Sequence, residues 1–147
     1  MTESATEWSG EHPGRRSWSV AASLLKGVGT GLVAGMASFV YNMSDLMAVN
    51  VDPTLLLVIT MLSGVFAHLL SKTLRESIRV GLVGYFSGGA TIVAAWIAPL
   101  WMVPYSSGAR EILLPKLAGE AVTAAFLVFT ATFFGAYLAA VIVEAYL

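Results

Sequence analysis

Four long apolar stretches alternate with short polar segments along the chain. They cover residues 19–43, 53–71, 80–103 and 117–147. The charge-free part of each stretch falls within the roughly 17–25 residues that an α-helix needs to cross a bilayer core of about 30 Å. None of the stretches has the polar outer face that a helix of a soluble bundle presents to water. The pattern therefore predicts an all-α integral membrane protein with four transmembrane helices in a compact up-down bundle.

The ends of these helices are indicated by proline and by capping residues. Asp52-Pro53 predicts the start of the second helix, because a carboxylate can cap free backbone N–H groups and proline is tolerated at the first helical position. Leu114-Pro115 is interpreted in the same way as the start of the fourth helix. Residues 1–18 are polar and lack apolar periodicity, so we expect a flexible cytoplasmic tail there. Residues 19–147 are expected to form one four-helix transmembrane domain.

The distribution of basic residues predicts the orientation. Six of the eight Lys and Arg residues lie on one side of the predicted helices: Arg15, Arg16, Lys26, Lys72, Arg75 and Arg79. Only Arg110 and Lys116 lie on the other side. The positive-inside rule then places both termini in the cytoplasm. We expect an integral protein of a prokaryotic plasma membrane.

A different interpretation of the N-terminal region is an export signal. The Arg15-Arg16 pair precedes an apolar run, as in twin-arginine signals. The next residues, Ser17, Trp18 and Ser19, lack the adjacent apolar pair that such signals carry. Three further predicted spans also make export of the chain implausible, so we favour a first transmembrane helix.

Composition agrees with a lipid environment. The chain has 147 residues, of which 57% are apolar and 12% charged, and its mean hydropathy is +0.78. Soluble domains carry about a quarter charged residues. The net charge of −1 provides no basic field, so no nucleic-acid partner is expected. The absence of cysteine excludes disulfides, thiolate nucleophiles and thiolate metal sites.

Small residues recur at four-residue spacing in the predicted helices. Such a stripe allows the backbone of another helix to approach closely. The glycines of this helix-packing seam are Gly27, Gly31 and Gly35 in the first helix, Gly84 and Gly88 in the third, and Gly135 in the fourth. The seam is expected to hold the four helices of one chain together. Alternatively, the longer stripe of the first helix joins a second copy or another subunit.

One cluster of polar residues is predicted near the cytoplasmic face. His68 is the ionisable residue inside a predicted span, and Lys26 and Glu144 belong at about the same depth. If the first and fourth helices are neighbours, Lys26 and Glu144 can pair, as a structural clasp or as a site for a headgroup or partner helix. For His68 we favour a hydrogen bond to a carbonyl or hydroxyl over the functional alternatives, which are a haem ligand, a proton relay and a pH-sensitive gate.

The missing features narrow the function. No Asp, Glu, Lys or Arg lies near the middle of any predicted helix, which argues against ion-coupled transporters and voltage sensors. We found no catalytic motif, metal-ligand set or cofactor motif, so an enzyme is not expected. The sequence favours a non-enzymatic multi-pass protein, a structural or accessory subunit that packs through its glycine seams. Besides the lipid bilayer, its partner would be another membrane subunit or a second copy. The alternative is a small homo-oligomeric channel or permease.

Overall fold

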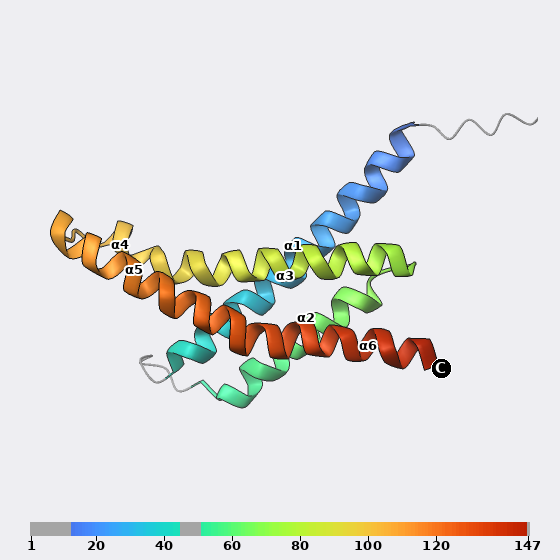
Figure 1. Ribbon diagram of the computed structural model, residues 1–147. Coiled ribbons are helices and arrows are strands. Elements are labelled where there is room, and N and C mark those ends of the chain that lie inside the picture. Colours follow the sequence, from blue (N-terminus) through green and yellow to red (C-terminus); the bar gives the residue numbers. More distant parts are fainter. Residues whose placement is uncertain (1–12, 45–50, 147) are drawn as a thin grey trace, which may run out of the picture.

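The computed structural model describes residues 13–44 and 51–146, and this part of the chain is built of helices and short connections (Figure 1). The elements are α1 (Pro13–Met43), α2 (Pro53–Leu69), α3 (Leu74–Ile97), the single turn α4 (Pro99–Met102), α5 (Ser107–Ala124), the π-helix η2 (Ala125–Phe134) and α6 (Gly135–Tyr146). The last three follow one another without a break, and we call them together the fourth helix. Residues 1–12, which make up most of the predicted tail 1–18, lie outside the described residues.

Three segments are long and apolar enough to cross a membrane: Trp18–Met43, Leu74–Met102 and Ser107–Tyr146. The remaining apolar helix, α2, is shorter, with 17 residues. The structure thus agrees with an all-helical membrane protein.

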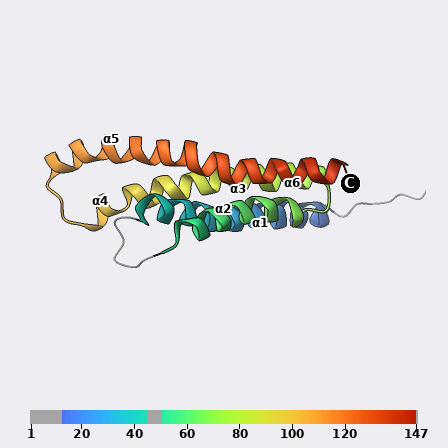
Figure 2. The ribbon, with the colours of Figure 1, turned by 90° about the horizontal axis from the view of Figure 1, so that it is seen from below.

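The helices form a bundle with crossed axes. Figure 2 shows α3 between α1 and α2 on one side and the fourth helix on the other. The fourth helix runs along α3, whereas α1 and α2 cross α3 obliquely (Figure 1). The described start of α1, the α2–α3 turn and the C-terminus all lie at one end, which we call the turn end. The α4 turn lies at the opposite end (Figure 1).

The start of α2 is confirmed. Asp52 has an extended backbone, and its carboxylate accepts a hydrogen bond of 2.8 Å from the N–H of Thr54. Pro53 occupies the first helical position, where no N–H is needed. The local pattern of cap and proline therefore fixes this end without help from tertiary contacts.

Three other predicted starts were wrong. Helix α1 begins at Pro13 and α3 at Leu74, each six residues before its predicted start, and the fourth helix begins ten residues early at Ser107. Pro115 consequently lies inside α5 and does not open it. Apolar stretches mark the part of a helix that suits lipid, but α3 and α5 begin earlier, in polar turns that Thr73 and Ser106 cap.

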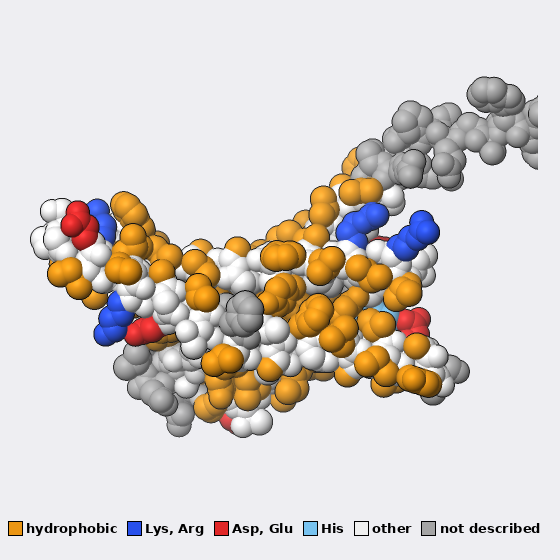
Figure 3. All heavy atoms as spheres, in the orientation of Figure 1, with side chains coloured by type: hydrophobic (Ala, Val, Ile, Leu, Met, Phe, Trp, Pro, Cys, Tyr) orange, Lys and Arg blue, Asp and Glu red, His pale blue; other side chains and the backbone are white. Residues whose placement is uncertain are grey.

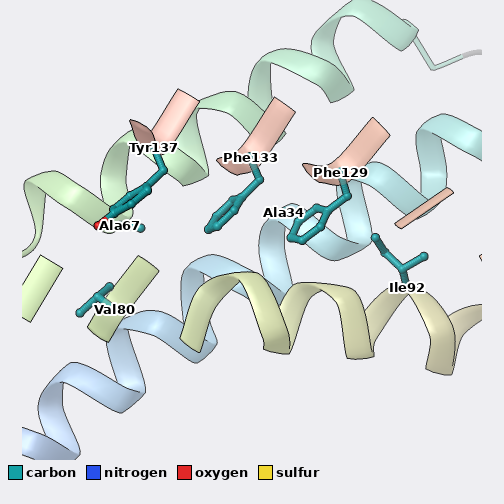
Figure 4. Packing of buried hydrophobic residues seen from close by; sticks show 7 residues of the cluster. All are labelled: Ala34, Ala67, Val80, Ile92, Phe129, Phe133 and Tyr137. Carbon is teal, nitrogen blue, oxygen red and sulfur yellow. The ribbon is translucent and has the colours of Figure 1, made fainter. Parts of the chain in front are cut away.

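An aromatic ladder on the fourth helix fills the core (Figure 4). Phe129, Phe133 and Tyr137 are buried, and the first two rings stack with their centroids 5.1 Å apart. Each ring lies against a glycine of α3: Phe129 covers Gly88, Phe133 covers Gly84 and Tyr137 covers Gly81. A methyl group at any of these glycines would collide with the ring, so the ladder depends on the missing side chains.

The glycine stripe of α1 packs against the same glycines of α3 that the aromatic ladder covers, Gly84 and Gly88. A side chain at Gly31 would meet the Gly84 carbonyl and the Ser87 hydroxyl, and one at Gly35 would meet the Gly88 backbone. Gly27 lies against Val83. The stripe is therefore covered inside the chain and is not free to join a second copy.

Gly135 is a correction to the predicted seam. Nothing lies within 4 Å of the place where its Cβ would stand, and Ala131 and Ala139, one turn away on either side, are exposed. The small-residue stripe of the fourth helix faces outwards because the aromatic ladder occupies the inward face. Gly64 of α2, which was not predicted, instead lies against the Phe133 carbonyl of this helix.

Candidate functional site

Polar side chains gather at the turn end of the bundle. Figure 3 shows basic and acidic groups there beside His68, while the surface between this end and the opposite one is largely apolar. The described polar residues of the turn end form two groups, one around Glu76 and one around His68.

The first group clamps the turn between α2 and α3. Thr73 caps α3 by accepting the N–H of Glu76 at 3.2 Å. The Glu76 carboxylate accepts a bond of 3.0 Å from the N–H of Lys72 and one of 2.8 Å from Lys26 Nζ. Lys26 also donates to the carbonyl oxygen of Leu70 at 2.8 Å, just beyond the last residue of α2. The lysine of α1 therefore neutralises the carboxylate and satisfies a free carbonyl of the turn.

The second group is a chain of hydrogen bonds from the surface into the core. Glu144 Oε2 lies 2.6 Å from His68 Nε2, and His68 Nδ1 lies 2.7 Å from the hydroxyl of Ser77. The Ser77 hydroxyl in turn lies 3.3 Å from the hydroxyl of Tyr137. His68, Ser77 and Tyr137 are buried, whereas the Glu144 side chain is 73% exposed. The chain connects α6 to α2 and α3.

The predicted cluster is thus only partly correct. Lys26, His68 and Glu144 do lie at one end of the bundle, but Lys26 pairs with Glu76 and Glu144 pairs with His68. The predicted Lys26–Glu144 pair is not formed, because α3 and α2 lie between α1 and α6 at this level. His68 has the hydroxyl partner that the sequence favoured and a carboxylate that it did not.

Carboxylate, imidazole and hydroxyl occur here in the order of a hydrolase triad, an arrangement that the sequence did not reveal. In such enzymes the hydroxyl must reach a substrate carbonyl, and backbone N–H groups must stabilise the oxyanion. Ser77 is 1% exposed, its N–H bonds to Thr73 within the helix, and Tyr137 covers its hydroxyl. In this arrangement the groups can share and hold a proton, and they tie three helices together.

A groove begins beside the His68–Glu144 pair and runs between α2 and α6. It has a volume of about 720 Å³ and is lined chiefly by apolar residues. Its walls include Met61, Val65 and Leu69 of α2 and Ala136, Ala140 and Val143 of α6. The pair is the charged end of an otherwise apolar surface.

A second hollow lies towards the opposite end, between the end of α1, α3 and α5. Trp96, Lys116 and Glu120 contribute to its lining. Trp96 Nε1 and Ser38 Oγ are buried without a hydrogen-bond partner among the described residues. Trp96 packs edge-on against Phe39, whereas Trp101 is exposed beneath the Arg110 guanidinium.

Sequence reasoning missed Glu76, Ser77 and Tyr137. Glu76 had a readable signal, because Thr73-x-x-Glu76 has the spacing of a capping box. Ser77 and Tyr137 had none, since their contact with His68 depends on how three helices are rotated. In the part of the chain that the structure describes, no three His, Asp or Glu residues are placed to hold a metal ion.

Comparisons with protein-family models, with curated proteins and with solved structures gave no match.

Proposed function

We propose that this chain is a four-span membrane protein with both termini in the cytoplasm, and that it works as a non-enzymatic structural or accessory subunit. The observation that carries the proposal is the packing of the middle of the bundle. Between the two ends the described helices carry no Asp, Glu, Lys or Arg, and the space is filled by the aromatic ladder and the glycines of α3.

Hydroxyl groups in this middle region support the same proposal. Thr60, Ser63 and Thr91 donate to carbonyls four residues earlier in their own helices. They satisfy themselves locally and do not form a polar path along the bundle. A pump or an ion-coupled transporter needs a buried group whose occupancy changes with the ion, and such groups are usually intramembrane carboxylates.

Four spans and a cytoplasmic N-terminus are part of the proposal. The 17 residues of α2 are at the lower limit for a spanning helix. Support comes from its position, because α2 packs against α1 and against the fourth helix. The six basic residues at one side of the helices support the orientation.

An outward-facing surface supports the partner role. The stripe of Ala131, Gly135 and Ala139 is exposed, and small residues of this kind let a second helix approach closely. A partner subunit would then be held by the fourth helix, since the stripe of α1 is already covered by α3.

The experiment is extraction in mild detergent, followed by measurement of the size and composition of the complex. A stable complex with a different subunit is expected. In proteoliposomes, the isolated chain should not move a solute in response to an imposed proton or sodium gradient. Gradient-driven uptake that is lost in His68→Ala would refute the accessory role and make His68 the coupling residue.

The same exposed stripe also favours a second candidate, a homo-oligomeric channel or permease. In that case the purified chain forms an oligomer of copies, and flux follows the gradient of the solute itself. Gly135→Leu should abolish both the oligomer and the flux. Gly29→Leu is the matched control, because nothing lies within 4 Å of a Cβ at Gly29 either and α1 does not carry the proposed interface.

A further inference from the structure

The groove between α2 and α6 is a built feature of the fold. The two helices touch at Gly64, whose missing side chain lets the backbone of Phe133 and Tyr137 approach. From there towards the turn end, α6 presents Ala136 and Ala140 to α2. A methyl group is too short to fill the space between diverging helices, so a groove of about 720 Å³ remains.

The groove opens onto the apolar outer surface. On its rim Met61 is 44% exposed, Leu69 65% and Val143 56%. In a bilayer such a surface faces hydrocarbon, and the groove has to be filled by an apolar chain. Its volume lies within the roughly 300–1,000 Å³ of pockets that hold small molecules, which favours a lipid chain over a whole helix.

The polar end of the groove favours a cation. One carboxylate oxygen of Glu144 contacts His68. The Glu144 side chain is 73% exposed, so the carboxylate can accept further hydrogen bonds. His68 is itself held by Ser77, which fixes the carboxylate in place. The C-terminal ends of α2 and α6 meet here, and the dipole of each helix places partial negative charge at this end.

We propose that this groove binds a phospholipid whose headgroup carries a primary ammonium. The ammonium donates to Glu144, and one acyl chain lies between Met61 and Val65 of α2 and Ala136 and Ala140 of α6. An anionic headgroup is disfavoured beside the carboxylate, and a quaternary ammonium has no N–H to donate. Lys72 directly follows the groove residue Ser71 and is exposed, so it offers a cation near the expected position of the lipid phosphate.

The test uses the full chain, freed of lipid in detergent. Phosphatidylethanolamine, phosphatidylcholine and phosphatidylglycerol with identical acyl chains are added in turn. Bound lipid is counted by native mass spectrometry, and the midpoint of thermal unfolding is followed in parallel. We expect phosphatidylethanolamine to bind about tenfold more tightly than the other two, as one charge-assisted hydrogen bond allows. Equal binding of the three lipids would overturn the proposal.

Two variants separate the contribution of the headgroup to binding from that of the acyl chain. Glu144→Gln should remove the preference for phosphatidylethanolamine. Ala140→Leu should fill the groove and weaken the binding of all three lipids. Glu111→Gln, at an exposed position near the opposite end, is the control and should keep the preference. The lipid-free unfolding midpoint of each variant shows whether it is folded. Unchanged lipid binding in both groove variants would refute the site.

A partner helix is the competing occupant. A photo-cross-linker placed at Val65, which lines the groove on α2 and is not part of the exposed small-residue stripe, should attach to lipid in native membranes. Attachment to a polypeptide would assign the groove to a protein and overturn the lipid proposal. Because the lipid measurements use the isolated chain, their outcome is independent of whether a partner subunit exists.

Discussion

At the scale of single residues, the contribution of each glycine to helix packing depends on which atoms face the position where a side chain would stand. Gly31 and Gly29 stand two positions apart in α1, yet the first faces the backbone of α3 and the second faces open space. Sequence spacing identified Gly31 and correctly left Gly29 out of the stripe. It misplaced Gly135, because a four-residue repeat shows that small residues share a face but does not show which face is buried.

This difference gives a paired prediction. Gly31→Leu should lower the free energy of unfolding by about 1–3 kcal/mol, because the new side chain collides with the Gly84 carbonyl. Gly29→Leu should change it by less than about 0.5 kcal/mol. Thermal unfolding in detergent, followed by circular dichroism, measures both. Equal effects of the two substitutions would mean that α1 and α3 are not in contact as described.

His68 shows the limit of prediction at this scale. Its depth followed from the position of Lys72 one turn later, but its partners Ser77 and Glu144 lie on two other helices. Eight residues lie between His68 and Ser77, and they include the turn that reverses the chain. Only the crossing of α2 with α3 and α6 brings the three together.

At the scale of elements, polar caps decided where helices begin. The basic segment 72–79 was expected to be a loop, but Thr73 and Glu76 form a cap there, and Arg75 and Arg79 lie on α3. In α5 the Ser106 hydroxyl accepts the N–H of Ala109, so the helix begins well before Pro115. Hydropathy cannot find such starts, because it measures preference for lipid and not backbone hydrogen bonding.

The clamp at Glu76 can be tested as an element of the turn. Glu76→Gln keeps the shape of the side chain but removes the ion pair with Lys26. We expect a loss of about 1 kcal/mol in the free energy of unfolding, since the pair is partly exposed. Glu111→Gln, on the exposed first part of α5, should be close to neutral. If both variants unfold like the parent protein in detergent, the Lys26–Glu76 ion pair does not stabilise the turn.

At the scale of the whole molecule, the fourth helix is longer than a membrane is thick. Its 40 residues span about 60 Å at 1.5 Å per residue, about twice the hydrocarbon core. Arg110, Glu111, Lys116 and Glu120 all lie in its first part, and residues 121–143 carry no charge. We expect the membrane to cover the later part, with α4 and most of α5 among the headgroups or beyond.

Four spans and a cytoplasmic N-terminus predict a pattern of accessibility. The chain has no cysteine, so single cysteines report without background. Val51→Cys and Ser107→Cys should react with an impermeant maleimide in intact cells, because both lie outside in the proposed orientation. Leu74, at the start of α3, is 59% exposed, and Leu74→Cys should react only after the membrane is opened.

Ser77 lies in the same turn but is unsuitable as a reporter position, because it is buried against His68 and would stay unlabelled on either side. Reaction of Val51→Cys and Leu74→Cys on the same side would mean that α2 does not cross. The reverse pattern at all three positions would invert the orientation and place the His68–Glu144 pair at the outer face.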